Sequence, residues 1–153
     1  SRGHEAFVKN INPLMRSGLV LSGANNVWNE KKDTLEFEDQ MNAEDGVITA
    51  FEISALDLSK TELAVLSACE TGLGDIKGSE GVYGLQRAFK MAGVKSLIMS
   101  LWQVPDKETE EFMTLFYKNL IKEKNIRTSF LKAQSVMRAK YPPYYWAAFV
   151  LVE

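Results

Sequence analysis

Residues 63–74 read Leu63-Ala64-Val65-Leu66-Ser67-Ala68-Cys69-Glu70-Thr71-Gly72-Leu73-Gly74, an apolar run followed by a cysteine and a glycine-rich segment. Four apolar residues are too few for a core helix, and the turn-forming residues behind them predict a buried parallel strand over residues 63–66. Open α/β sheets bind their ligands at the carboxyl ends of such strands. The chain's one cysteine, Cys69, therefore lies where a functional site is expected.

The composition is that of an ordinary globular domain, with 46% hydrophobic and 25% charged residues among 153. We expect a single domain over residues 1–153, long enough to bury a core. The formal net charge of −2 argues against direct binding of nucleic acid. The apolar runs are too short to span a membrane. A single cysteine excludes an internal disulfide, which suits a reducing compartment, so we expect a cytoplasmic protein.

Outside residues 63–74, short apolar runs alternate with segments of helical periodicity. Val82, Leu85 and Ala88 recur at spacings of three and four residues, and Gly93 ends their pattern, which predicts a helix over residues 80–93. Further strands are predicted at 19–21, 96–101 and 146–152, with an extended piece at 46–49, and further helices at 50–56, from Asp106 through Leu120, and at about 128–139.

Two residues are candidate N-caps of the later helices, Asp106 and Thr128. Residues 25–45 are rich in Asn, Asp, Glu and Lys and are predicted to form a long surface loop or insertion. The alternation of strands and helices predicts an α/β sandwich with a mostly parallel sheet.

The predicted topology brings two segments to one edge of the sheet. A right-handed crossover through the 80–93 helix would make the two apolar strands neighbours, so Cys69 and the Trp102–Asp106 segment would share one rim. A thiolate nucleophile needs a base or a positive field, and backbone N–H groups to hold an oxyanion. Gly72 would let the backbone approach a substrate closely. Asp106 could bind a basic substrate side chain, cap its helix, or do both.

Two other interpretations of these residues remain open. A lone cysteine beside a strand is often a small buried hydrophobic residue. The glycines between this strand and the next helix are also compatible with a phosphate-binding loop, although neither GxGxxG nor GxxxxGK[ST] is present. A nucleotide-binding domain would bind a phosphate ligand at residues 70–81 and be indifferent to thiol alkylation.

Seven short motifs follow one another along the chain. They are Asn12-Pro13-Leu14, Arg16-Ser17-Gly18-Leu19-Val20-Leu21 with Gly23-Ala24-Asn25, Ser67-Ala68-Cys69-Glu70-Thr71-Gly72, Gly78-Ser79-Glu80-Gly81, Leu85-Gln86-Arg87-Ala88-Phe89 with Ala92-Gly93-Val94, Ser100-Leu101-Trp102-Gln103-Val104-Pro105-Asp106, and Tyr145-Trp146-Ala147-Ala148-Phe149. In this order they resemble the CHAT domain, a caspase-like cysteine peptidase family related to separases and clostripain. The resemblance spans essentially the whole chain, and the ordered series is more specific than any single motif.

The resemblance implies a caspase-like three-layer α/β/α sandwich and peptide-bond hydrolysis through a Cys–His dyad, with no metal or other cofactor. It places the nucleophile at Cys69. Asp106 would favour a basic residue before the scissile bond, and the other substrate-binding candidates are Trp102, Glu70 and Gly72. Members are often fused to helical-repeat (TPR-like) sensor domains and often work in bacterial signalling or defence. The implied partners are a protein or peptide substrate and such a sensor domain.

One departure from the family pattern concerns the dyad histidine. In the family it lies in a Thr-His-Gly motif after an apolar strand, whereas the single histidine here is His4, in Gly3-His4-Glu5. We therefore assign His4 no catalytic role and expect the base on an upstream segment or on a partner fragment released by proteolytic processing. This chain alone is then expected to be catalytically incomplete. The alternative is a non-catalytic CHAT-like module that binds partners and signals.

Overall fold

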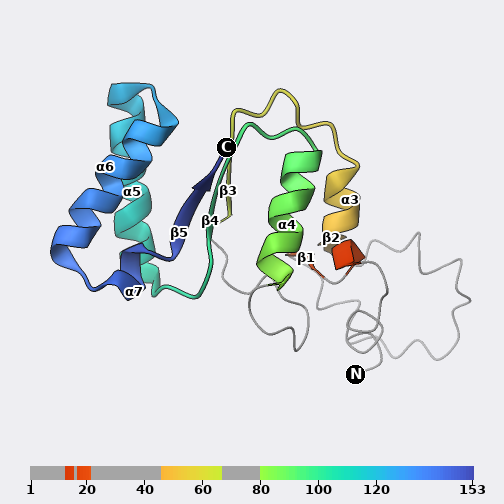
Figure 1. Cartoon of the computed structure of the whole chain (residues 1–153), viewed down its shortest axis with the longest axis horizontal. Coiled ribbons are helices and arrows are strands. Elements are labelled where there is room, and N and C mark those ends of the chain that lie inside the picture. Colours follow the sequence, from red (N-terminus) through yellow and green to blue (C-terminus); the bar gives the residue numbers. More distant parts are fainter. Residues whose placement is uncertain (1–12, 16, 22–45, 67–79) are drawn as a thin grey trace, which may run out of the picture. The chain divides into compact units, whose positions relative to one another are not determined.

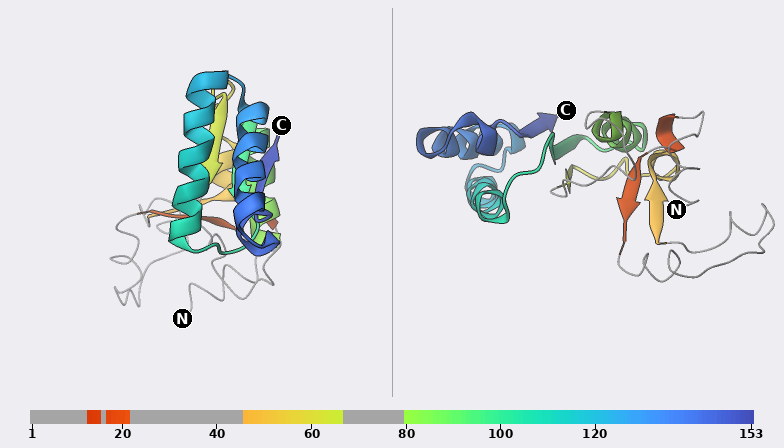
Figure 2. Two further views of the ribbon diagram at one scale, coloured as in Figure 1. Left: turned by 90° about the vertical axis from the view of Figure 1, so that its left-hand side faces the viewer. Right: turned by 90° about the horizontal axis from the view of Figure 1, so that it is seen from below.

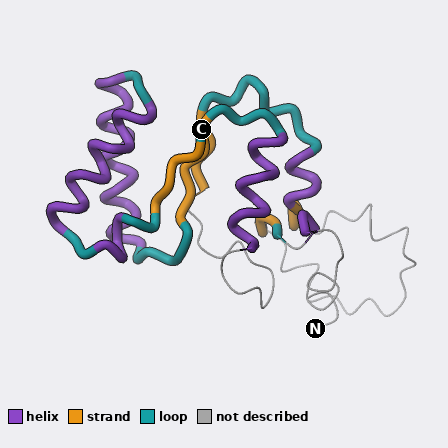
Figure 3. The backbone as a smooth tube through the Cα atoms, in the orientation of Figure 1, coloured by secondary structure: helices purple, strands orange, loops and turns teal. Residues whose placement is uncertain are grey.

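The computed structural model describes residues 13–15, 17–21, 46–66 and 80–153 (Figure 1). The predicted loop at 25–45 lies outside these ranges. Contacts within the chain define two compact units: unit 1 is Ser1–Leu56 with Thr71–Ala92, and unit 2 is Asp57–Glu70 with Gly93–Glu153. Both units mix helices with small sheets (Figure 3), so the predicted mixed α/β character of the chain is confirmed.

Unit 1 contains a two-stranded antiparallel sheet and two helices that pack side by side. Thr49 begins α3 with a capping box, because its hydroxyl accepts from the Glu52 N–H while the Glu52 carboxylate accepts from the Thr49 N–H. The predicted apolar face of α4 is confirmed by the burial of Val82, Leu85 and Ala88. The elements are η1 (Pro13–Met15), β1 (Gly18–Val20), β2 (Val47–Thr49), α3 (Ala50–Ser54) and α4 (Glu80–Met91).

A close approach between α4 and the segment before β1 explains a glycine inside this helix. A Cβ added at Gly84 would lie 2.3 Å from the Ser17 Oγ. Ser17 is buried, and its hydroxyl has no hydrogen-bond partner in the part of the chain that the structure describes. Gly84 therefore replaces the better helix former alanine because a side chain there would displace the serine.

Unit 2 is a three-stranded sheet with two long helices side by side over it (Figure 2, left). The strand order is β3-β4-β5; β3 and β4 are parallel, with Leu66 opposite Met99, and β5 is antiparallel to β4. The elements are β3 (Leu63–Leu66), β4 (Ser96–Ser100), α5 (Asp106–Glu123), α6 (Ile126–Lys140), α7 (Pro143–Trp146) and β5 (Phe149–Val152).

Aromatic side chains form the core of unit 2. Phe112 of α5 lies between two partners: its ring is nearly parallel to that of Phe149, with centroids 4.2 Å apart, and meets the Phe130 ring edge-on at 5.5 Å. Such contacts add to the free energy from apolar burial itself. On α5, Phe112 and Phe116 are four residues apart and therefore lie on the same, buried face of the helix. The buried residues of this cluster are Ile98, Val104, Phe112, Phe116, Phe130, Ala133, Met137, Ala148 and Phe149.

Two expectations about the sheet are wrong for the described strands. Among them only β3 and β4 pair in parallel, whereas β1–β2 and β4–β5 are antiparallel, so the predicted mostly parallel pairing is not observed. β3 is half-buried, not buried, because it has a neighbour on one side only within the described sheet. The central strand β4 is buried throughout, as its continuous apolar run predicts.

Both predicted helix caps are also wrong. Asp106 is the first residue of α5, the cap position is Pro105, and no side chain caps this helix. Thr128 lies inside α6, where its N–H donates to the Asn125 side chain at 2.8 Å, so Asn125 is the cap. Cap positions depend on the local backbone conformation, which residue type alone does not determine.

Gly93 ends the segment after α4 in a conformation that other residues rarely adopt. Its φ is +99°, and an added Cβ would lie 2.9 Å from the Ser59 Cα. We predict that Gly93→Ala lowers the free energy of unfolding by about 1–3 kcal/mol, because it combines positive-φ strain with a backbone clash. Urea unfolding followed by tryptophan fluorescence measures this. Gly93→Asn carries the same Cβ and is expected to be destabilised as well; equal stability of Gly93→Ala and the parent would contradict the prediction.

Candidate functional site

The candidate site lies at the edge of unit 2 where β3 and β4 end. Leu66 is registered opposite Met99, so the chain leaves both strands at the same rim, as the sequence predicts. Phe149, the first residue of β5, pairs with Ser100 at this rim. Two described segments therefore meet there: the loop from Leu101 to Pro105 and the residues that precede β5.

The structure describes two of the residues predicted for the site, Trp102 and Asp106. The other three, Cys69, Glu70 and Gly72, lie outside the described residues, as does His4. Among the described residues, no three His, Cys, Asp or Glu side chains are grouped as ligands for a metal ion.

The loop from Leu101 to Pro105 is anchored to the core of unit 2. Val104 is 3% exposed and belongs to the aromatic cluster of unit 2. The Leu101 N–H donates to the Ala148 carbonyl at 2.9 Å, which continues the pairing of β4 with the segment before β5. At the far end, the Thr109 N–H donates to the Pro105 carbonyl at 3.0 Å and begins α5. These contacts position the backbone on both sides of Trp102 and Gln103.

Tyr144 of α7 holds the middle of this loop. The Trp102 Nε1–H donates to the Tyr144 carbonyl at 2.9 Å, and the Tyr144 hydroxyl donates to the Gln103 carbonyl at 2.8 Å. The two rings lie 6.3 Å apart at 32°. Trp102 remains 37% and Tyr144 54% exposed, so an aromatic surface faces solvent beside the loop.

Sequence reasoning assigns no role to Tyr144 and predicts a strand over 146–152 without a helix before it. The strand begins only at Phe149, because Pro143 starts the short helix α7. Proline is favoured in the first turn of a helix, so Pro142-Pro143 before an aromatic run is a signal that could have indicated α7. That the Tyr144 side chain reaches Gln103, 41 residues away, is a tertiary fact.

Asp106 is exposed at the first position of α5. Its carboxylate makes no capping hydrogen bond and no ion pair with another residue that the structure describes. A negative charge in the first turn of a helix interacts favourably with the helix dipole. Asp106 therefore presents an exposed carboxylate, without an ion pair among the described residues, that a cationic group could bind.

A second group of charges joins α5 to the end of α6. The Glu111 carboxylate accepts hydrogen bonds from the Lys140 Nζ at 2.5 Å and from the Tyr141 hydroxyl at 2.6 Å. The bond from Lys140 and then that from Tyr141 hold the pKa of Glu111 below its ordinary value of 4.5. The same contacts raise the pKa of Tyr141 and of Lys140. These groups link the helices that carry the core.

The Glu111 link predicts a pH-dependent contribution to stability. A carboxyl group whose folded-state pKa is lowered stabilises the fold above pH 4.5, and this contribution is lost as the pH falls through the folded value. We expect Glu111→Gln to lower the melting temperature at pH 7 and the difference from the parent to shrink at pH values below 4.5. Calorimetry across this range measures it. Glu110→Gln is the matched control, and an equal pH dependence in both variants would refute the assignment.

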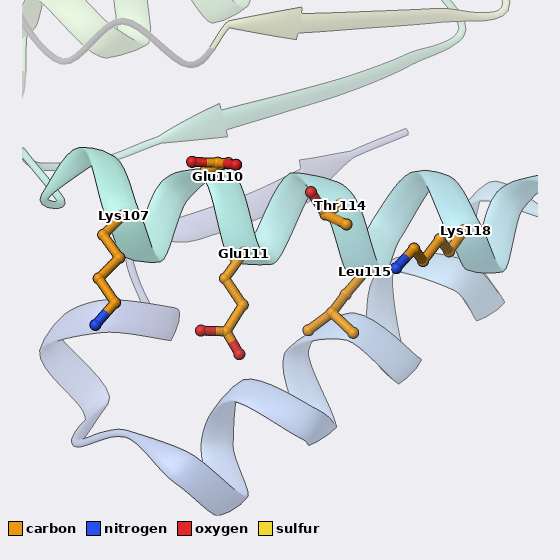
Figure 4. A pocket seen from close by; sticks show the side chains of 6 residues that line it. All are labelled: Lys107, Glu110, Glu111, Thr114, Leu115 and Lys118. Atoms are coloured by element: carbon orange, nitrogen blue, oxygen red, sulfur yellow. The ribbon is translucent and has the colours of Figure 1, made fainter.

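An open groove of about 380 Å³ runs along α5, lined by Lys107, Glu110, Glu111, Thr114, Leu115 and Lys118. Figure 4 shows Glu111 and Leu115 pointing from α5 towards the neighbouring helix α6. Two lysines flank two glutamates, so the groove has no net charge to attract one kind of ion. Its lining holds no cysteine or histidine, and the rim at β3 and β4 remains the candidate site.

The fold and the rim define a mixed α/β domain with a candidate site at the carboxyl ends of two parallel strands. The CHAT domain family model matches residues 3–153, so the chain belongs to the CHAT domain family. None of the described helices is long and apolar enough to cross a membrane.

Two relatives are repeat proteins. Tetratricopeptide repeat protein 28 of Mus musculus is 30% identical over 109 residues, and that of Homo sapiens is 28% identical over 109 residues. Each alignment covers 69% of this chain and 4% of the relative, so the chain spans a small part of the relatives' length. No solved structure matches the chain.

Proposed function

We propose that this chain carries the nucleophile of a CHAT-type cysteine endopeptidase. The observation that supports this most is the parallel pairing of β3 with β4, with Leu66 opposite Met99. Cys69 is three residues beyond Leu66, and Trp102 is three residues beyond Met99. Three residues span at most about 11 Å, so the distance along the chain is compatible with Cys69 acting at the rim that carries Trp102 and Asp106.

The proposed reaction is the hydrolysis of a peptide bond. A histidine base takes the proton of the Cys69 thiol, and the sulfur attacks the scissile carbonyl carbon, whose oxygen is held by the Cys69 N–H. The C–N bond then breaks, the proton passes to the leaving amine, and water hydrolyses the thioester to release the acid and restore the thiol. The histidine is proposed to come from an upstream segment or a processed partner fragment, not from His4.

Asp106 is proposed to recognise the substrate, and Trp102, Glu70 and Gly72 are the other proposed substrate-binding residues. An exposed carboxylate without an ion pair among the described residues suits a lysine or arginine side chain before the scissile bond. The aromatic surface of Trp102 and Tyr144 would further favour a cation. Membership of the CHAT family supports this assignment.

The remaining family features are proposals of the same kind. They are a caspase-like three-layer α/β/α sandwich, a single domain over residues 1–153 with a surface insertion at 25–45, and a cytoplasmic location. A TPR-like sensor domain is the proposed partner, since both relatives are named for tetratricopeptide repeats.

A substrate-like probe tests the peptidase proposal. We expect an arginine-directed acyloxymethyl ketone to form a single adduct at Cys69 in the protein that also contains the dyad histidine, as measured by intact mass and peptide mapping. Asp106→Asn is expected to lower the labelling rate by about tenfold or more, because a charged hydrogen bond is lost. The rate with iodoacetamide, which needs no basic pocket, is the internal control. Adduct formation independent of Asp106 would contradict its proposed role.

The second candidate is a non-catalytic CHAT-like module that binds partners. The observation in its favour is that both relatives are named for their repeats and not for a peptidase activity. This candidate predicts that Cys69 reacts with iodoacetamide but not with the arginine-directed probe. The two reagents together therefore separate a catalytic site from an accessible cysteine.

A further inference from the structure

We propose that Tyr144 is a positioning residue, which holds the Trp102–Gln103 loop so that the Trp102 ring and Asp106 act together on a basic substrate side chain. The expected effect on substrate preference rests on the proposed peptidase function, whereas the contacts of Tyr144 do not depend on it. It concerns one link between α7 and the loop after β4 within unit 2.

The link is reciprocal. Trp102 donates its Nε1–H to the Tyr144 carbonyl, and Tyr144 donates its hydroxyl to the Gln103 carbonyl. Each segment therefore supplies one donor and one acceptor, and the tilted ring contact at 6.3 Å closes the arrangement. Breaking the hydroxyl bond would free the Gln103 peptide and loosen the ring that Trp102 packs against.

Within the described ranges, Trp102 and Gln103 have no other hydrogen-bonded anchor. Leu101 is tied to Ala148, and Val104 is buried in the core, but Trp102 and Gln103 between them are exposed. In the part of the chain that the structure describes, both side-chain hydrogen bonds of this middle part involve Tyr144: its carbonyl accepts from Trp102, and its hydroxyl donates to Gln103. The orientation of the Trp102 ring is therefore determined by α7.

The segment that carries Tyr144 is itself tied to its neighbours in unit 2. Pro143 begins α7, and the Tyr144 ring meets the Tyr145 ring edge-on at 5.4 Å. The Gln134 amide donates to the Trp146 and Phe149 carbonyls, which ties the segment after Tyr144 to α6. Through these contacts, the position of Tyr144 and of the loop that it holds depends on α6 and α7.

The expected consequence is discrimination between basic side chains. A planar guanidinium stacks on an aromatic face while it binds a carboxylate, whereas a lysine ammonium gains less from the ring. A well-oriented Trp102, four residues before Asp106 in the chain, should therefore favour arginine over lysine. A loop that moves should lose this preference before it loses binding of a basic residue.

The test compares Tyr144→Phe with the parent by two independent measurements. Tyr144→Phe removes the hydroxyl bond to Gln103 but keeps the ring and the carbonyl that accepts from Trp102. We expect faster amide hydrogen exchange in residues 101–105 with unchanged exchange in α5 and α6. We also expect the rate of Cys69 labelling by an arginyl acyloxymethyl ketone to fall about three- to tenfold, as for loss of one hydrogen bond, with a smaller fall for the lysyl probe.

Tyr145→Phe is the matched control, since the Tyr145 hydroxyl has no hydrogen-bond partner within the described ranges. Unchanged exchange in residues 101–105 of Tyr144→Phe, or an equal rise throughout unit 2, would overturn the positioning role. An equal fall with both probes would overturn the preference for arginine. If the parent reacts with neither basic probe, the peptidase proposal fails, and the exchange result alone decides whether Tyr144 anchors the loop.

Discussion

Replacing Cys69 by alanine is expected to lower the rate of peptide hydrolysis by a factor of about 10⁴ or more, in the protein that contains both this chain and its dyad histidine. The physical reason is that the thioester route needs the sulfur nucleophile, and removing a nucleophile leaves only the catalysis supplied by binding and oxyanion contacts. Initial rates on an arginine-containing peptide measure the loss.

The control for this prediction is the stability of each variant. Cys69→Ala removes one sulfur atom, so the melting temperature of the variant should remain close to that of the parent. Cys69→Ser keeps the shape but offers a hydroxyl that does not ionise at neutral pH, and it should be nearly as inactive. Hydrolysis that persists in both variants would refute Cys69 as the nucleophile.

Phe112→Ala is expected to cause the largest loss of stability, about 3–5 kcal/mol in the free energy of unfolding. Phe112 is 0% exposed and contacts the rings of both Phe130 and Phe149, so its removal leaves a cavity between α5, α6 and β5. Urea unfolding followed by tryptophan fluorescence measures the loss, because Trp102 and Trp146 both belong to unit 2.

Ile121→Ala is the matched control on the same helix. Ile121 is 79% exposed, so its truncation should change the free energy of unfolding by no more than about 0.5 kcal/mol. Phe112→Leu should lie between the two, since it keeps part of the buried volume. Equal losses for Phe112→Ala and Ile121→Ala would show that the aromatic cluster does not determine the stability of unit 2.

Local patterns predicted most elements of the described fold. The spacing of Val82, Leu85 and Ala88 predicts α4, and the apolar run before Trp102 predicts β4, because a side chain's periodicity follows directly from helix or strand geometry. The errors fall at boundaries: Asn125 caps α6 in place of Thr128, and α7 precedes β5. These depend on competition between neighbouring residues, which periodicity does not describe.

For the candidate site, the sequence predicted correctly which strand ends share a rim. The rule that consecutive strands joined by a helix are parallel neighbours predicts that the ends of β3 and β4 share a rim, and their pairing confirms it. Asp106 was predicted to cap α5 or bind substrate, and the structure removes the first role. The catalytic assignment of Cys69 remains a prediction from chemistry and family membership.

The sequence by itself determined most of the strands and helices and their order, the family, and the position of the cysteine after a strand, because these depend on residues close together in the chain. The tertiary structure alone decided that β5 runs antiparallel to β4 and that Tyr144 holds the Trp102 loop. Those features join residues between 41 and 55 positions apart. Such contacts form only when the core of unit 2 has placed α7 beside the end of β4, and no local sequence pattern predicts that contact.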